Sequence, residues 1–91
     1  MNVKASAHST KHDSLGRTVR ETRARRSMSQ EELGHEADLH RNYVGAIERG
    51  EINPTFRVLL KLARGLRVPL SELLALTEQR HRETYRGPLG S

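Results

Sequence analysis

Residues 28–55 read MSQEELGHEADLHRNYVGAIERGEINPT, and they contain the start and stop signals of two short helices. Ser29 followed by Glu32 is the pattern of a capping box, in which each side chain accepts a hydrogen bond from the other residue's backbone N–H. Leu33 and Ala37 are four residues apart, so they share the apolar face of one helix. This part of the stretch predicts a helix that begins directly after Ser29.

A second helix is predicted in the same stretch, over about residues 41–49. Its apolar side chains, Tyr43, Val44 and Ile47, recur at the three- and four-residue spacing of a helix face. Gly50 follows the last of them and is a typical helix terminator. Gly45 lies in the middle, where glycine lowers helix propensity by about 1 kcal/mol relative to alanine.

Only residues 38–40 separate the two helices, so together they predict a helix-turn-helix at about residues 29–49. In that geometry the second helix enters the major groove of DNA and its first residues reach base edges. Those residues are Arg41 and Asn42 here. Arginine can bind guanine O6 and N7 with two hydrogen bonds, and asparagine can bind adenine N6 and N7. The arrangement therefore favours DNA recognition.

Three further helices are predicted around this pair, over about residues 14–26, 56–66 and 70–79. The first of these helices can be capped by Asp13 or Ser14, the second by Thr55, and the third can begin at Pro69. No segment has the alternating pattern of a strand, so the expected fold class is all-α, a five-helix bundle. The apolar positions of these three helices are Leu15, Val19 and Ala24; Phe56, Leu59, Leu60, Ala63 and Leu66; and Leu70, Leu73, Leu74 and Leu76.

The composition limits the function classes. The 91 residues suffice for one domain, and 34% hydrophobic with 3% aromatic residues allows only a small aliphatic core. The absence of cysteine excludes disulfides and thiolate-bound metals. No nucleophile elbow, carboxylate pair, phosphate loop or metal-ligand spacing is present. We therefore expect no enzyme activity, no cofactor and no metal site.

The charge is unevenly distributed along the chain. The formal net charge is +5, and residues 14–26 contain five arginines against one glutamate, whereas residues 31–51 have a net charge of −4. Clustered arginine is typical of a polyanion partner but equally of a solvated helix face. No apolar run is long enough to span a membrane and no signal peptide is seen, so a cytoplasmic, nucleoid-associated protein is expected.

The two ends differ in composition from the middle. Residues 1–13 are polar and aperiodic, and we expect a disordered arm there, with tracking along DNA as the alternative. Residues 14–79 form the expected helix-turn-helix domain. Residues 80–91 are expected to be a basic flexible tail, whose final GPLGS looks like an expression-vector remnant.

Taken together, these motifs resemble the lambda repressor/Cro-like family of helix-turn-helix proteins, often called Xre-type. The resemblance covers about residues 15–76. It is carried by the run from Ser29 to Leu33, the Tyr43-Val44 pair, the run from Ile47 to Gly50, Asn53-Pro54 and the run ending Leu66-x-Val68. The resemblance implies a five-helix bundle that binds double-stranded operator DNA, usually as a two-fold homodimer.

The resemblance also implies roles for individual residues. Arg23 and Glu48 match a partly buried, structural ion pair. The base-reading positions are Arg41, Asn42, Gly45 and Ala46. The positions expected to contact DNA phosphates are Gln30, His40, Tyr43, Asn53, Thr55 and Arg57. For Tyr43 the alternative is a place at the edge of the core, and for Asn53, Thr55 and Arg57 it is a plain loop or cap role.

Three positions, Asp38, His40 and Gly45, depart from the family pattern. Asp38 stands where the turn commonly has glycine, and aspartate tolerates the left-handed backbone required there. His40 replaces the usual serine or threonine cap, so it is either a weak cap facing solvent or a donor to phosphate. Gly45 and Ala46 are small, which concentrates direct base recognition in Arg41 and Asn42 and favours close approach to the DNA.

The expected function is that of a sequence-specific transcriptional regulator, acting as a homodimer and repressing or activating from an operator. The expected dimer surface consists of Leu66, Leu70, Leu73 and Leu74, with burial in the chain's own core as the alternative. An antitoxin-like protein-interaction module with secondary DNA binding is the rival function, and a non-specific nucleic-acid binder is another. A toxin or RNA polymerase is the further candidate partner.

Overall fold

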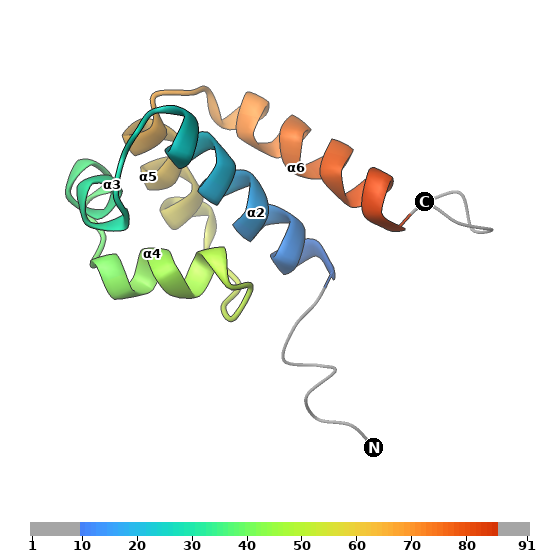
Figure 1. The fold of residues 1–91 in the computed structure, drawn as a ribbon, viewed down its shortest axis with the longest axis horizontal. Coiled ribbons are helices and arrows are strands. Elements are labelled where there is room, and N and C mark those ends of the chain that lie inside the picture. Colours follow the sequence, from blue (N-terminus) through green and yellow to red (C-terminus); the bar gives the residue numbers. More distant parts are fainter. Residues whose placement is uncertain (1–9, 86–91) are drawn as a thin grey trace, which may run out of the picture.

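Five helices follow one another in the computed structural model, which describes residues 10–85 and the side chains of residues 13–83. They are α2 (Thr10–Arg25), α3 (Gln30–Ala37), α4 (Arg41–Glu48), α5 (Phe56–Leu66) and α6 (Leu70–Tyr85) (Figure 1). The described part of the chain contains no strand. The expected all-α class and the helix-turn-helix formed by α3 and α4 are therefore confirmed.

The first and last helices are longer than predicted. Helix α2 begins at Thr10, so residues 10–13 are helical rather than disordered, and Asp13 and Ser14 lie inside the helix instead of capping it. Helix α6 continues to Tyr85, so residues 80–85 are not a flexible tail. The predicted arm before residue 10 and the remnant at residues 86–91 lie outside the described residues.

Tertiary packing between α2 and α6 accounts for the added length. The two helices run side by side in opposite directions (Figure 1). The Arg80 guanidinium on α6 forms an ion pair with the Glu21 carboxylate on α2. The Thr18 hydroxyl, which is buried on α2, is satisfied within the helix by donating to the carbonyl of Ser14 at 2.9 Å.

Ala24 corrects one detail of the predicted apolar face of α2. It is exposed, whereas Leu15 and Val19 are buried. A residue five positions after Val19 is rotated about 140° around the helix, because each residue turns the helix by roughly 100°. Thr22, three positions after Val19, is buried instead.

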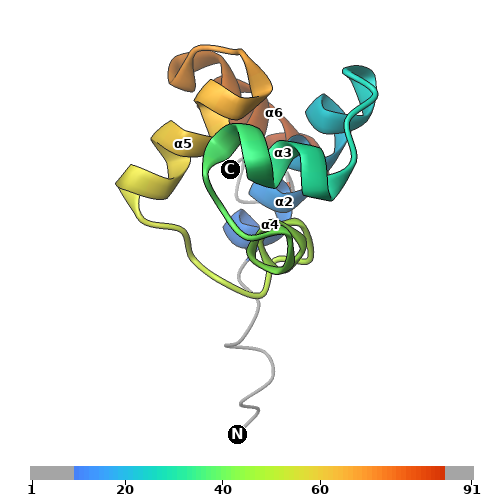
Figure 2. The same cartoon turned by 90° about the vertical axis from the view of Figure 1, so that its left-hand side faces the viewer.

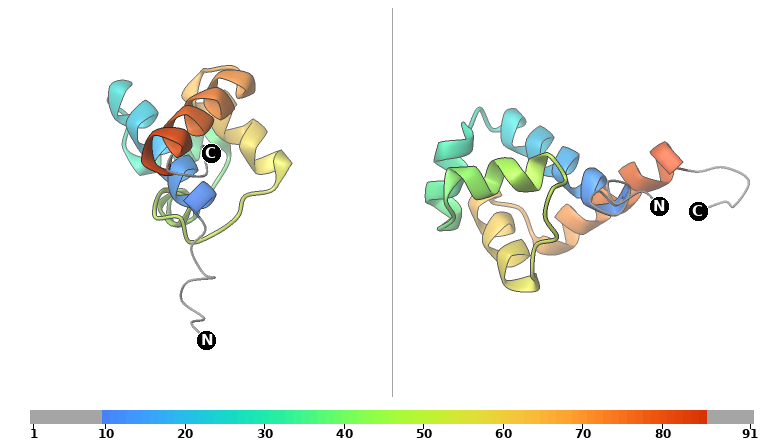
Figure 3. Two further views of the ribbon diagram at one scale, coloured as in Figure 1. Left: turned by 90° about the vertical axis from the view of Figure 1, so that its right-hand side faces the viewer. Right: turned by 90° about the horizontal axis from the view of Figure 1, so that it is seen from below.

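The core lies between the helix-turn-helix and the other three helices. Helix α3 packs on α4 and α5, and α4 packs on α2 (Figure 2). Seen from below, α4 lies on the underside of the molecule, with its end next to α2 (Figure 3, right). The largest fully buried side chains come from all five helices: Val19, Leu33, Val44, Ile47, Leu62, Leu66 and Leu73.

The predicted start and stop signals operate as expected in the helix-turn-helix. The Ser29 hydroxyl accepts from the Glu32 N–H at 2.9 Å, and the Glu32 carboxylate accepts from the Ser29 N–H at 2.7 Å. Asp38 ends α3 in the left-handed region, with φ of 58°. Gly50 follows α4 with φ of 74°, and the N–H of Glu51 donates to the carbonyl of Ala46 at 3.0 Å. These bonds satisfy backbone groups that helix ends leave open.

One close contact was not evident from the sequence. Gly16 on α2 lies against the end of α4, where an added Cβ would be 2.5 Å from the carbonyl oxygens of both Ile47 and Glu48. Real carbon and oxygen atoms cannot approach that closely, and backbone atoms cannot move aside as a flexible side chain can. Gly16 therefore sets the spacing between α2 and α4.

This contact predicts the effect of Gly16→Ala. Helix propensity alone would make the alanine variant about 1 kcal/mol more stable. Because the methyl group would force α2 away from α4, we expect a loss of about 1–3 kcal/mol in the free energy of unfolding instead. Urea denaturation followed by circular dichroism measures the change.

Arg20→Ala on the exposed side of α2 is the matched control, and its stability should change by no more than about 0.5 kcal/mol. A Gly16→Ala variant as stable as the original chain would contradict the close contact.

Candidate nucleic-acid interface

Helix α4 exposes one face of the molecule and buries the other. Val44, Ile47 and Glu48 are buried and attach the helix to the core. Asn42 and Arg49 are exposed and lie seven residues apart, with the half-buried Ala46 between them on the same side. A helix anchored on one side with small and polar side chains on the other can enter a groove without exposing its core.

Arg41 lies at the beginning of this helix, beside α3. Its side chain is 61% exposed, and its Nη1 is 3.6 Å from Glu31 Oε1, whose side chain is 75% exposed. Exposed ion pairs of this kind contribute little to stability and break easily. The guanidinium of Arg41 is therefore available to another acceptor, as predicted for a base-reading residue.

His40 is the N-cap of α4. Its backbone is extended, and its Nδ1 accepts a hydrogen bond from the backbone N–H of Asn42 at 3.0 Å. The ring replaces the hydroxyl that usually satisfies this donor. Of the two predicted roles for His40, the structure shows the cap, and the exposed ring leaves its contact with a phosphate as a prediction.

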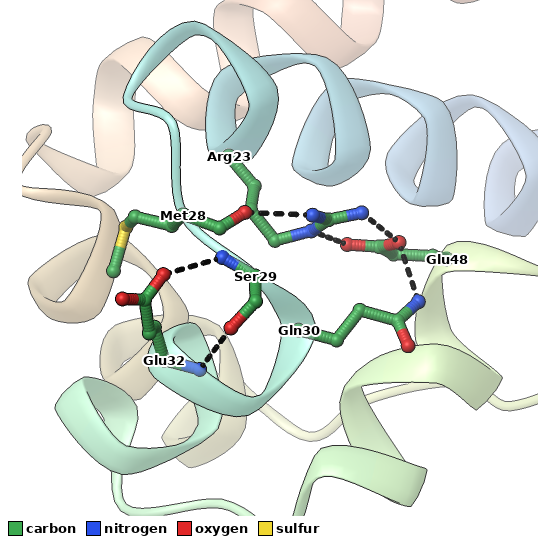
Figure 4. Close-up of polar contacts among 6 residues, drawn as sticks. All are labelled: Arg23, Met28, Ser29, Gln30, Glu32 and Glu48. Atoms are coloured by element: carbon green, nitrogen blue, oxygen red, sulfur yellow. Dashed lines mark hydrogen bonds and ion pairs between the residues drawn. The ribbon is translucent and has the colours of Figure 1, made fainter.

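A buried ion pair joins the first helix to the recognition helix, as predicted. The guanidinium of Arg23 binds the carboxylate of Glu48 with two hydrogen bonds, from Nε at 2.6 Å and from Nη2 at 3.0 Å (Figure 4). Only 3% of the Glu48 side chain is exposed. The hydrogen bond to Glu48 raises the pKa of Arg23, against the opposing effect of burial. The remaining Nη1 donates to the carbonyl of Met28 at 2.8 Å, so Arg23 also holds the start of α3.

Gln30 extends this network to the exposed surface. Its Nε2 donates to Glu48 Oε1 at 2.9 Å, and its side chain is half-buried at the junction of α3 and α4 (Figure 4). The carboxylate of Glu48 thus fixes the orientation of the amide. Gln30 was predicted to contact DNA phosphate, and the structure places it beside the exposed face of α4 in a defined rotamer.

Gly45 is covered rather than open, which alters its predicted role. An added Cβ would be 3.0 Å from Arg49 Nη1 and 3.5 Å from Gln30 Oε1, so these side chains occupy the space above the glycine. Bare backbone at Gly45 therefore does not form the surface. The side chain of Arg49 forms the surface there. From the sequence, Arg49 was predicted only to end the helix, although its spacing of seven residues from Asn42 indicated that the two share a face.

The other predicted phosphate contacts lie around and after α4. Tyr43 is half-buried and packs against the core, which leaves its edge accessible. Asn53 is exposed in the loop before α5. The Thr55 hydroxyl caps α5 by accepting from the N–H of Val58 at 3.2 Å, and Arg57 is exposed in the first turn. None of these positions is blocked by the fold.

Two of the four predicted dimer residues belong to the core instead. Leu66 and Leu73 have no exposed surface within a single chain, so they cannot contact a second copy directly. Leu70 is partly buried against the core, and Leu74 is 40% exposed. The helix pattern identified apolar positions correctly but could not show which of them face inward.

A different pair of apolar side chains is exposed on α5. Phe56 and Leu60 are 66% and 46% exposed and lie four residues apart, on one face of the helix. From the sequence, both residues were predicted to lie on the apolar face of this helix. Exposed large apolar side chains that adjoin one another are typical of protein–protein contact surfaces.

Other kinds of site were tested on the described residues. Among the side chains of residues 13–83, no group of histidine, aspartate and glutamate is arranged to hold a metal ion. Among the helices of residues 10–85, none has both the length and the apolar character needed to cross a membrane.

Comparison with known proteins identifies relatives with this arrangement. The helix-turn-helix family HTH_3 matches residues 19–73. Control protein C.BamHI from Bacillus amyloliquefaciens is 43% identical over 64 residues, which cover 69% of this chain and 79% of the relative. The crystal structure of the restriction-modification controller protein C.AhdI from Aeromonas hydrophila is 39% identical, with a TM-score of 0.67 over 68% of this chain and 94% of that chain. The restriction-modification controller protein C.Esp1396I has the same fold, with a TM-score of 0.78, 24% identity, and coverage of 84% of this chain and 99% of that chain.

The buried ion pair predicts a large effect of Glu48→Ala. The substitution leaves the Arg23 guanidinium mostly buried without its carboxylate and also removes the acceptor of Gln30. We expect the free energy of unfolding to fall by about 3 kcal/mol, measured by urea denaturation. Glu31→Ala, which removes the exposed partner of Arg41, is the control and should change stability by no more than about 0.5 kcal/mol.

The double substitution Arg23→Met, Glu48→Leu tests the cause. Because it removes both charges together, it should cost less than Glu48→Ala alone. A larger loss in the double variant would mean that packing, rather than the unpaired charge, dominates.

Proposed function

Because the chain belongs to the helix-turn-helix family, we propose that it is a sequence-specific DNA-binding regulator of transcription that controls the genes of a restriction-modification system. The control proteins of such systems among its relatives support the specific role. A protein with this function acts on the bacterial chromosome or a plasmid, so we place it in the cytoplasm.

The exposed face of α4 is the observation that carries this proposal. Arg41 and Asn42 are both exposed at the first turn, at the end that enters the major groove in helix-turn-helix proteins. Their side chains match guanine and adenine, respectively. His40 caps this turn and the ion pair of Glu48 anchors the other end, so the reading residues are held on a rigid element.

Phosphate contacts would fix the position of α4 along the groove. Gln30, at the start of α3, lies beside α4 with its amide oriented by Glu48. Tyr43, Asn53, Thr55 and Arg57 supply further hydroxyl, amide and guanidinium donors around the same helix. Such contacts position a protein on DNA without reading its sequence.

A homodimer would place two copies of α4 on a two-fold related operator. We propose that Phe56 and Leu60 on α5 form its centre, in place of Leu66 and Leu73. Exposing both apolar side chains to water is unfavourable, and burying them against the same pair of a second copy makes a self-complementary contact.

The DNA-reading role predicts different effects for two arginines. On a site selected from random DNA, Arg41→Ala should weaken binding by about 1–3 kcal/mol and relax the preference at one position of each half-site, because a base contact is lost. Arg57→Ala should weaken binding to all sequences about equally and lower the dependence on salt, because a phosphate contact is lost. Fluorescence anisotropy at two salt concentrations measures both effects.

The outcome also separates rival functions. Enrichment of no site by the original chain would indicate non-specific binding, and weak binding to all DNA would indicate a protein-interaction module. An Arg41→Ala variant with unchanged base preference would rule out Arg41 as a reader.

The dimer proposal predicts the mass of the protein in solution. Size-exclusion chromatography with light scattering at tens of micromolar should give twice the mass of one chain, and Phe56→Asp with Leu60→Asp should give the mass of one chain with unchanged circular dichroism. Ala24→Asp on the exposed side of α2 is the control and should remain dimeric. A single-chain mass for the original protein would contradict the proposal.

A further inference from the structure

Arg49 is a third polar side chain on the exposed face of α4. It directly follows the last residue of the helix, seven positions after Asn42, and its side chain is 58% exposed. Its guanidinium does not extend away from the protein. Instead, Nη1 lies 3.0 Å from the point that a Cβ on Gly45 would occupy, so the group folds back over the helix.

Glu51 holds the guanidinium in this position. Arg49 Nε donates to Glu51 Oε2 at 2.8 Å, and Arg49 Nη2 donates to Glu51 Oε1 at 3.2 Å. These hydrogen bonds raise the pKa of Arg49. The paired bonds fix both the distance and the plane of the guanidinium, which a single bond would not do.

We propose that Arg49 is a further base-reading residue of this protein and that Glu51 is the residue that positions it. The inference rests on the proposed function as a DNA-binding regulator and names a specificity determinant within the same site.

The hydrogen bonds to Glu51 leave one edge of the Arg49 guanidinium unoccupied by that carboxylate. A guanidinium has five N–H donors in a planar fork. Glu51 occupies the edge formed by Nε and Nη2, so the opposite edge, formed by Nη1 and the second N–H of Nη2, faces away from the carboxylate. That edge carries two parallel donors, which match the O6 and N7 acceptors of guanine.

This position of the Arg49 guanidinium requires a residue without a side chain at position 45. A methyl group at position 45 would meet Nη1 at 3.0 Å, closer than most such contacts, and any longer side chain would displace the guanidinium. The half-buried Ala46 next to it is also small. The absence of a side chain at Gly45 thus leaves the space that the guanidinium of Arg49 occupies over α4.

The position of Arg49 along the helix indicates where it reads. Seven residues of α-helix span about 10 Å. Base pairs are about 3.4 Å apart along DNA. If α4 follows the groove, the base read by Arg49 lies roughly three base pairs from the one read by Asn42. The same two donors also fit two phosphate oxygens, and a phosphate contact, unlike a base contact, would carry no preference for guanine.

Selection of binding sites from random DNA tests the proposal with the full chain. The variants are Arg49→Ala, Glu51→Gln and both together, and Arg82→Ala on α6 is the control with the same change of charge as Arg49→Ala. We expect Arg49→Ala to lower the preference for guanine at one position of each half-site by about 10- to 100-fold while other positions keep theirs. Arg82→Ala should leave the profile unchanged.

Glu51→Gln distinguishes positioning from a purely structural role. It should lower the preference at that same position by about 3- to 10-fold, since it loosens the bidentate pair. It should also raise affinity for random DNA, because it removes a negative charge beside the phosphates. In the Arg49→Ala background, Glu51→Gln should have no further effect on base preference, since the residue that it positions is absent.

The possible failures are distinguishable. A uniform loss of affinity in Arg49→Ala, or an unchanged profile, would overturn the role of Arg49 while the enriched site of the original chain still supports the proposed function. An effect of Glu51→Gln on base preference that persists without Arg49 would overturn the positioning role. Enrichment of no site by the original chain would overturn both proposals together.

Discussion

The ion pair between Arg23 and Glu48 is the constraint on which the rest of the structure depends. Through it, one guanidinium joins the last turns of α2 to the carboxylate on α4 and to the carbonyl of Met28 at the start of α3. The carboxylate in turn accepts from Gln30, so the two helices of the motif and α2 share one buried polar junction. A charge pair is costly to desolvate, and here the hydrogen bonds between Arg23 and Glu48 hold the two groups in one orientation. It therefore fixes the angle of α4 more narrowly than apolar packing alone would.

The short recognition helix α4 has a low intrinsic tendency to form a helix. Eight residues are too few to form a stable helix alone, and Gly45 lowers its propensity further. The fold compensates with a cap at His40, a left-handed terminator at Gly50 and the anchoring of Val44 and Ile47 in the core. Gly16 allows α2 to approach the end of α4 closely, so the anchored side is held at backbone contact. The exposed side can consequently remain small and polar without loss of the helix.

Local signals made much of this predictable from the sequence. The capping box at Ser29 and the turn at Asp38 were predicted from residue type and spacing, and the ion pair between Arg23 and Glu48 from the family resemblance. All three occur in the structure. The features that could not be predicted from the sequence, namely the burial of individual leucines and the length of α6, depend on tertiary packing. Three leucines of the same apolar character differ in burial: Leu66 and Leu73 are buried and Leu74 is exposed. Their burial depends on how α5 and α6 pack on their neighbours. The extension of α6 past residue 79 likewise depends on its pairing with α2, including the ion pair between Arg80 and Glu21.

The acidic residues of the helix-turn-helix acquire a role when they are considered with the arginines beside them. The sequence showed only that residues 31–51 carry net negative charge, which is unexpected next to a polyanion. In the structure, Glu31 lies beside Arg41 and Glu51 binds Arg49. Each carboxylate offsets the charge of an arginine on the exposed face, which weakens attraction to phosphates of any sequence. Hydrogen bonds from the arginines to guanine do not depend on net charge in the same way. In the proposed function, pairing a reading arginine with an acid would lower non-specific affinity more than specific affinity, which would widen the ratio between the two affinities.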